Sequence, residues 1–268
     1  MHLFRIFVIL LILVPFIVSP RVAHADYLTI RVPAYSDGVH SYFVDLLTSA
    51  LSKAGHLATI EQVSDIPHLR ERAMLETGEL SVLWLIRSQQ RDKRYFPVPV
   101  KLTNGMIGKR ILLVPRNQKE DYKDIKTLRD FRKLGKIGGF GTQWFDVGVW
   151  KANDLPYLEV TQWRLLYHMV ADESRGVDYF SRGINEVMDE VENHPELVIE
   201  PHIMLVYDRD FIFYVTPTRP QLAKTLRSAL EEARNSGLMD QLIKKHWGKS
   251  FEFLQPEPRT IIPLHSPQ

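Results

Sequence analysis

Strand-like and helix-like segments alternate along this chain from residue 27 onward, and no other feature restricts the possible fold as strongly. Residues 27–32 alternate apolar with polar side chains, as a half-buried strand does, and Pro33 ends the pattern. The next segment has an apolar stripe at helical spacing, made of Phe43, Leu46, Leu47, Ala50, Leu51 and Ala54. Because further pairs of this kind follow, the sequence predicts an α/β protein in which helices cover sheets.

A polar stretch at residues 116–121 separates two series of such pairs. The second series runs from 125 to 193, and a long apolar and aromatic segment at 203–215 leads into two closing helices. At 268 residues the chain is long enough for two medium-sized domains. We expect residues 249–268 to form an extended, mobile tail, because they hold Pro256, Pro258, Pro263 and Pro267.

The first 25 residues have the three parts of a secretory signal peptide. The basic Arg5 precedes an unbroken apolar run at 6–18, and Ala23-His24-Ala25 supplies the small residues at which signal peptidase cuts. A spanning helix needs roughly 20 apolar residues, whereas this run is shorter and contains Pro15. An uncleaved anchor is therefore disfavoured, and we expect cleavage after Ala25 and export to the periplasm.

Charge and cysteine content exclude several classes of protein. The chain has 34 basic and 32 acidic residues, and loss of the signal peptide removes Arg5 and Arg21 but no acid, so the two signs become equal. A nucleic-acid-binding protein normally has a clear basic excess, so we expect no nucleic acid partner. The absence of cysteine excludes thiol catalysis, cysteine-ligated zinc, disulfides and a lipid-modified cysteine.

Several short phrases, in their order along the chain, resemble one family of exported binding proteins. The phrases are Leu28–Tyr35, Gly78–Val82, Arg91–Arg94, Leu134–Thr142 and Ser236–Gly248. Over nearly all of residues 26–248 the chain resembles the extracytoplasmic solute-binding proteins of the polar amino-acid ABC-transporter type. The segment 178–186, Asp-Tyr-Phe-Ser-Arg-Gly-Ile-Asn-Glu, further resembles a divergent subgroup of transporter substrate-binding domain proteins.

This resemblance implies a two-lobed, type II periplasmic-binding-protein fold that closes on its ligand like a jaw. Each lobe would be a mixed sheet flanked by helices. Lobe 1 would comprise residues 26–112 and 205–248, and lobe 2 residues 113–204. Two strands, near 110–114 and near 203–207, would join the lobes as a hinge, and closure would bury the ligand between them.

Arg91 matches the position at which the resembled family clamps a substrate carboxylate. A guanidinium pairs with a carboxylate through two parallel hydrogen bonds, which a lysine cannot reproduce. Arg94 takes this role if the register is shifted by three residues. The alternative is that Arg87, Arg91, Lys93 and Arg94 form only a solvated charged face.

Two further groups of residues are candidates for the ligand site. Gly141 and Thr142 end a glycine-rich turn between a strand and a helix, where backbone N–H groups and a hydroxyl bind anions readily. The glycine spacing fits no nucleotide-binding fingerprint, and a simple tight turn is the alternative. Tyr35, Trp84 and Trp144 lie at loops or strand ends that face the cleft in the resembled fold, where rings line small-solute pockets. Core or hinge packing is the alternative for each ring.

Asp178 and Arg182 bear on the identity of the ligand. Amino-acid binders of the resembled family place an acid a few residues after the position of Asp178 to hold the ligand's ammonium group, and this chain has Ser181-Arg182-Gly183 there. A cation at this place would repel an α-amino group, which favours an anion or a modified solute. Asp178 would either substitute for the missing acid or serve a structural role.

We therefore expect a periplasmic protein that binds a small polar, carboxylate-bearing solute, an amino acid or a related compound, without covalent chemistry. Its partner would be an ABC permease or a membrane sensor, and we expect no cofactor and no metal. A dehydratase-like periplasmic enzyme on the same fold is the second candidate, because some relatives of this fold are enzymes. The sequence has neither Gly-x-Ser-x-Gly nor His-Glu-x-x-His, and its histidines lack ligand spacing.

Overall fold

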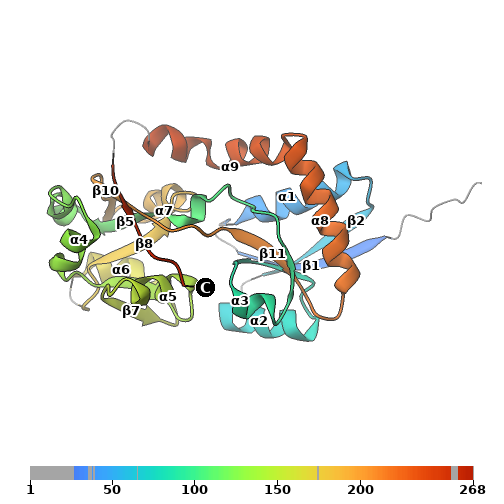
Figure 1. Ribbon diagram of the computed structural model, residues 1–268, viewed down its shortest axis with the longest axis horizontal. Coiled ribbons are helices and arrows are strands. Elements are labelled where there is room, and N and C mark those ends of the chain that lie inside the picture. The colour runs from blue at the N-terminus through green and yellow to red at the C-terminus, as the bar shows by residue number, and fades with distance from the viewer. Residues whose placement is uncertain are drawn as a thin grey trace, which may run out of the picture.

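The computed structural model describes residues 27–35, 38, 40–64, 66–173, 175–254 and 259–267. The expected signal peptide at 1–25 lies outside the described residues. Helices and strands alternate within two lobes that lie side by side, and helix α9 (Leu238–Leu254) runs along one side of the molecule (Figure 1). None of the helices in the described ranges is long and apolar enough to cross a lipid bilayer.

Lobe 1 is built from two separate stretches of the chain. Its elements are β1 (Leu28–Ala34), α1 (Ser41–Lys53), β2 (Ala58–Ser64), α2 (His68–Thr77), β3 (Val82–Ile86), α3 (Gln89–Asp92), β4 (Phe96–Val98), β11 (Phe211–Val215), α8 (Pro220–Asn235) and α9. Strands β1 and β2 pair in parallel, and β11 lies antiparallel between β3 and β4. The Ser81 N–H donates to the Arg31 carbonyl at 2.8 Å and joins the two sets of strands.

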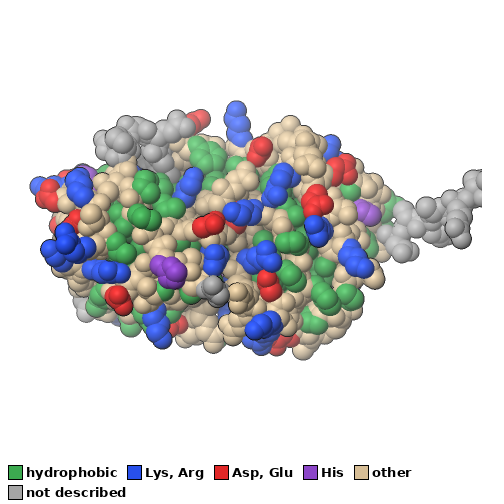
Figure 2. Space-filling view, viewed as in Figure 1, with side chains coloured by type: hydrophobic (Ala, Val, Ile, Leu, Met, Phe, Trp, Pro, Cys, Tyr) green, Lys and Arg blue, Asp and Glu red, His purple; other side chains and the backbone are tan. Residues whose placement is uncertain are grey.

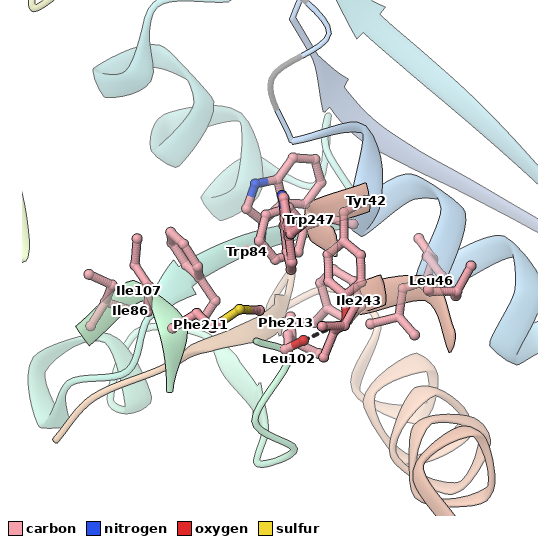
Figure 3. Packing of buried hydrophobic residues seen from close by; sticks show 14 of the residues in the cluster. Tyr42, Leu46, Trp84, Ile86, Leu102, Ile107, Phe211, Phe213, Ile243 and Trp247 are labelled. Carbon is pink, nitrogen blue, oxygen red and sulfur yellow. Dashed lines mark hydrogen bonds between the residues drawn. The ribbon is translucent and has the colours of Figure 1, made fainter. Parts of the chain in front are cut away.

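The core of lobe 1 is the apolar stripe of α1 packed against the sheet and against α8 and α9. The stripe residues Phe43, Leu46 and Leu47 are fully buried, as their helical spacing predicted. The Phe43 ring stacks on Trp84 with centroids 5.0 Å apart. The Tyr42 hydroxyl donates to the Leu102 carbonyl at 2.5 Å, so this aromatic cluster is held by a polar contact as well as by packing (Figure 3).

Lobe 2 is the middle of the chain with one later strand added. Its elements are η1 (Met106–Gly108), β5 (Lys109–Pro115), η2 (Arg116–Tyr122), α4 (Leu128–Leu134), β6 (Gly138–Gly141), α5 (Phe145–Ala152), β7 (Tyr157–Val160), α6 (Leu165–Ala171), β8 (Tyr179–Gly183), α7 (Val187–Asn193), β9 (Leu197–Ile199), β10 (Ile203–Val206) and β12 (Thr260–Pro263). The strand order is β12-β10-β5-β8-β6-β7, and β9 also pairs with β5. Both lobes thus combine strands with helices, as the pattern predicted; the described strands of lobe 1 form a two-stranded and a three-stranded sheet, whereas those of lobe 2 form one.

The crossings between the lobes lie outside the strands that were expected to form the hinge. Both β5 and β10 belong to the sheet of lobe 2, where Leu205 pairs with Arg110. The chain therefore leaves lobe 1 between residues 98 and 109, before the expected boundary at 112, and returns between 206 and 211, after the expected boundary at 204. In the sequence, residues 203–215 form one apolar run. Nothing in that run indicates that its two halves, β10 and β11, join different sheets.

The structure corrects the prediction that residues 249–268 form an extended, mobile tail. Helix α9 continues to Leu254, and β12 pairs in parallel with β10 at the edge of lobe 2. Ile262 and Leu264 are buried there, and the Asn153 side chain exchanges two hydrogen bonds, of 2.7 and 2.9 Å, with the backbone of His265. Pro263 does not prevent this pairing, because a proline is tolerated in an edge strand.

Surface charge is mixed on the face shown in Figure 2. Lys and Arg side chains are interspersed with Asp and Glu side chains across both lobes of this view. This distribution agrees with the nearly equal numbers of basic and acidic residues in the sequence.

Candidate ligand-binding site

A cavity of about 100 Å³ lies between the lobes and takes its walls from both. Its charged side chains are Glu71, Arg72, Arg91, Arg110, Asp146, Arg164, Arg182 and Glu186, and its rings include Tyr35, Trp84, Trp144 and Trp163. Five residues that were predicted from the sequence therefore meet here, namely Tyr35, Trp84, Arg91, Trp144 and Arg182. The mixture of rings and charged groups suits a small polar solute.

Aromatic contacts close the cavity from opposite lobes. Trp144 and Trp163 of lobe 2 lie with ring centroids 5.5 Å apart. The His68 ring of lobe 1 approaches both, at 6.5 Å from Trp144 and 6.3 Å from Trp163. On the lobe 1 side, Tyr35 meets the edge of Trp84 at 6.4 Å. The lobes are thus in contact across the mouth of the cavity.

Arg91 has a partly buried guanidinium without an acidic partner among the described residues. Its Nη1 donates to the Ile86 carbonyl, and no carboxylate of the described residues lies within ion-pairing distance of it. Burial and the neighbouring charge of Arg72 lower the pKa of Arg91 to about 10, so it stays protonated at neutral pH. Arg94, the other candidate, is half exposed, pairs with Glu76 and does not line the cavity.

Arg182 is buried in a network that offsets its charge. Its guanidinium pairs with Glu186 at 3.2 Å and with Glu190 at 2.5 Å, and it lies 5.2 Å from the ring centroids of both Trp144 and Trp163. Burial raises the pKa of Glu190. Burial also acts to raise the pKa of Glu186, but the charges of Arg182 and Arg110 and the His40 contact together outweigh burial and hold that pKa well below its ordinary value. These two carboxylates offset the Arg182 charge, so the expected repulsion of an ammonium group by Arg182 is weakened.

Arg110 and Asp146 are site residues that the sequence reasoning missed. Arg110 is 1% exposed, pairs with Asp146 at 3.2 Å and donates to the Ser181 carbonyl at 2.7 Å. Asp146 is in the first turn of α5 and accepts a 2.7 Å hydrogen bond from the Tyr207 hydroxyl. The available signal was Arg110 itself, because an arginine inside the apolar run at 107–114 must find buried acceptors.

Two histidines at helix starts were also missed. His40 precedes α1 with a left-handed φ of 74°, accepts a hydrogen bond from the Trp84 indole at 3.0 Å and reaches Glu186 of lobe 2 at 3.4 Å. His68 begins α2 and contacts Glu71 at 2.8 Å, and that same carboxylate accepts from the Tyr35 hydroxyl at 2.8 Å. No sequence motif marks these positions, because their partners come from distant elements.

The glycine-rich corner does not line the cavity. Strand β6 stays paired with β7 through Gly141, and the Thr142 N–H donates to the Val160 carbonyl at 3.2 Å, so it is not available to an anion. Gly141 instead makes room for the Trp144 ring, since a Cβ at this position would lie 2.3 Å from the indole. The predicted anion corner is therefore a packing site in this structure.

Asp178 also lies away from the cavity lining. Its carboxylate accepts the Ile137 N–H at 2.6 Å and so fixes the start of β6, which is a structural role. Among the described residues, no three His, Asp or Glu side chains gather as metal ligands.

Solved structures share the architecture of this chain, while neither a protein-family model nor a curated protein matches its sequence. An ancestral arginine-binding protein bound to arginine is 16% identical, with 82% of this chain and 98% of that chain covered at a TM-score of 0.60. An amino acid ABC transporter substrate-binding protein from Streptococcus pneumoniae, bound to L-arginine, is 15% identical, with 84% and 95% covered at 0.60. A periplasmic His/Glu/Gln/Arg/opine family-binding protein from Silicibacter pomeroyi, in complex with lysine, is 14% identical, with 82% and 97% covered at 0.61. The chain therefore has the two-lobed α/β fold of the amino-acid-binding proteins of ABC transporters, the fold that its sequence resemblance predicted.

Proposed function

We propose that this protein is a periplasmic solute-binding protein that captures a small, carboxylate-bearing solute between its lobes. One observation carries the proposal, namely the guanidinium of Arg91 in the cavity without a carboxylate partner among the described residues. A cation that is taken out of water without a partner is costly, so an anionic group of a ligand is stabilised there.

The surroundings of Arg91 support capture rather than chemistry. Of the three acids in the cavity wall, Asp146 and Glu186 are each paired with an arginine, and Glu71 is held by Tyr35 and His68. A general base needs a free, correctly placed acceptor for a substrate proton. The bound solute would pass to an ABC permease or be reported to a membrane sensor.

Substitution of Arg91 tests this function directly. Purified protein is screened by thermal shift against the common L-amino acids, C4 to C6 dicarboxylates, short peptides and sugars. A compound at a hundred times its dissociation constant should stabilise the protein by about 2.7 kcal/mol. Arg91→Gln should weaken binding of that compound at least tenfold, because it removes the bidentate donor.

Arg94→Gln is the matched control, because Arg94 lies three residues away and is half exposed outside the cavity. It should leave the affinity unchanged. A carboxylate compound that binds equally well to the Arg91→Gln protein would refute the assignment, and turnover of the compound would favour the enzyme.

A further inference from the structure

A buried acid fixes the ring of His68 in the wall of the cavity. The His68 Nδ1 lies 2.8 Å from Glu71 Oε2, and the Tyr35 hydroxyl donates to Glu71 Oε1 at 2.8 Å. Glu71 is 1% exposed, and no lysine or arginine in the described part of the chain pairs with it. An ionised carboxylate only accepts hydrogen bonds, so Nδ1 carries a hydrogen. Both oxygens of Glu71 therefore serve to orient side chains of the cavity wall.

The other ring nitrogen of His68, Nε2, has no hydrogen-bond partner among the residues that the structure describes. It does not belong to the buried, unpartnered polar atoms of those residues, and the His68 side chain is 29% exposed. Because the ring lines the cavity, a ligand there can reach Nε2. One nitrogen is thus held by the protein while the other is open to a ligand.

The ring neighbours of His68 are aromatic. The ring centroids of Trp144 and Trp163 of lobe 2 lie 6.5 and 6.3 Å from that of His68, and the centroid of Tyr35 lies 5.8 Å from it. A polar nitrogen among such rings discriminates between ligands, because an apolar ligand group would leave Nε2 without a partner once the lobes close.

Helix α2 carries this arrangement into the closed cleft. His68, Glu71 and Arg72 follow one another at i, i+3 and i+4, so they share one face of the helix, and all three line the cavity. Arg72 donates to the Gln143 side chain of lobe 2 at 3.0 Å. The face of α2 that carries His68 is therefore held against lobe 2.

We infer that His68 is a specificity-determining residue whose Nε2 forms a hydrogen bond with a hydroxyl or amide group of the ligand. Glu71 and Tyr35 are the positioning residues that orient its ring. This inference rests on the proposed function and refines it, since the solute then carries a neutral polar group in addition to the carboxylate that Arg91 binds. Hydroxyl and amide groups both donate and accept, so they pair with Nε2 whether or not this nitrogen is protonated.

The test compares ligands of similar size that differ in one polar group. Binding is measured by calorimetry for three pairs: L-threonine and L-valine, L-asparagine and L-leucine, and 4-hydroxybutanoate and pentanoate. In at least one pair the unmodified protein should bind the polar compound about fivefold or more tightly than the apolar one. His68→Phe should remove that preference, because it keeps a ring without a nitrogen, while the apolar compound still binds and so reports an intact cavity.

A compound found in the wider screen is tested in the same way against its counterpart without the polar group. His56→Phe is the matched control, because His56 lies between α1 and β2, outside the cavity lining. It should leave the preference unchanged.

Nitrogen-15 NMR of the histidine rings gives a second readout that does not depend on affinity. The His68 signals, identified by their loss in His68→Phe, should show a protonated Nδ1, and the Nε2 signal should shift when a polar compound binds. Glu71→Gln should reduce both the protonation of Nδ1 and the preference for the polar compound. A purely structural role of Glu71 would lower stability without either change.

The inference is overturned if the preference survives His68→Phe, if Nδ1 of His68 carries no proton, or if the apolar compounds bind the unmodified protein as tightly as the polar ones. None of these results alters the effect of Arg91→Gln on carboxylate binding, so the proposed function would stand. If no carboxylate compound among the six or in the wider screen binds, both fail.

Discussion

At the scale of single residues, Asp45 connects the first helix of lobe 1 to the last. Its Oδ2 accepts from Lys245 Nζ at 2.7 Å and lies 2.8 Å from His246 Nε2, both on α9. The Lys245 hydrogen bond, followed by that of His246, lowers the pKa of Asp45 below its ordinary value of 3.8. The folded state therefore prefers the ionised carboxylate, and this stabilisation is complete above the ordinary pKa and is lost as pH falls through the lowered one.

Asp45→Asn should lower the free energy of unfolding by up to about 1 kcal/mol at pH 6, because the pair is partly exposed. The difference from the unmodified protein should disappear in strong acid, where both side chains are neutral. Urea unfolding at a series of pH values measures this difference in the free energy of unfolding. Asp124→Asn, at an exposed position, should show no such difference, and a gap that persists below the lowered pKa would contradict the assignment.

Several side chains of the cavity were predictable from the sequence, but the residues that they contact were not. The resemblance supplied Arg91 and the rings Trp84 and Trp144, because strand ends recur at the same place in this fold. It could not supply Asp146 or His40, whose neighbours in space are far along the chain. The Arg182 network was not predictable from spacing, because Arg182 lies in strand β8 whereas Glu190 lies on helix α7, and the fold alone brings them together.

At the scale of elements, β12 has two neighbouring isoleucines on opposite faces. Ile262 is fully buried against lobe 2, whereas Ile261 is 56% exposed. Ile262→Ala should cost about 2–5 kcal/mol of stability through lost burial and a residual cavity. Ile261→Ala, in the same strand, should change stability by less than about 0.5 kcal/mol. Equal effects of the two substitutions on thermal unfolding would show that β12 does not dock in this way.

Element types were predictable where the apolar pattern was long, and short or interrupted elements were not. The stripe of α1 and the alternation of β1 fixed both elements to within a few residues. Strand β12 is only four residues long and ends in Pro263, so it has no pattern that distinguishes it from a loop. The side chains that hold this segment, such as Asn153, come from another part of lobe 2.

At the scale of the whole molecule, polar contacts across the cleft hold the lobes together. Arg72 of lobe 1 donates to the Gln143 side chain at 3.0 Å and to the Gln143 carbonyl at 3.3 Å. Gln143→Ala removes the first contact, so the unliganded protein should spend more time with its lobes apart. Small-angle X-ray scattering should then give a larger radius of gyration, and the apparent affinity for a ligand should fall, because closure costs more.

Gln162→Ala provides the comparison, because Gln162 is exposed on lobe 2. It should leave the radius of gyration as it is. If Gln143→Ala also leaves it unchanged, the Arg72 contact does not stabilise the closed arrangement.

The position of β12 has a consequence for how the protein acquires its fold. Lobe 1 lacks β11, α8 and α9 until residues 211–254 have been made, and the sheet of lobe 2 lacks its last strand until residues 260–263 follow. Chains are synthesised from the N-terminus, and a domain that is contiguous in sequence can fold as soon as it has emerged. Neither lobe here is one continuous stretch of chain, so each stays incomplete until these later segments have been synthesised.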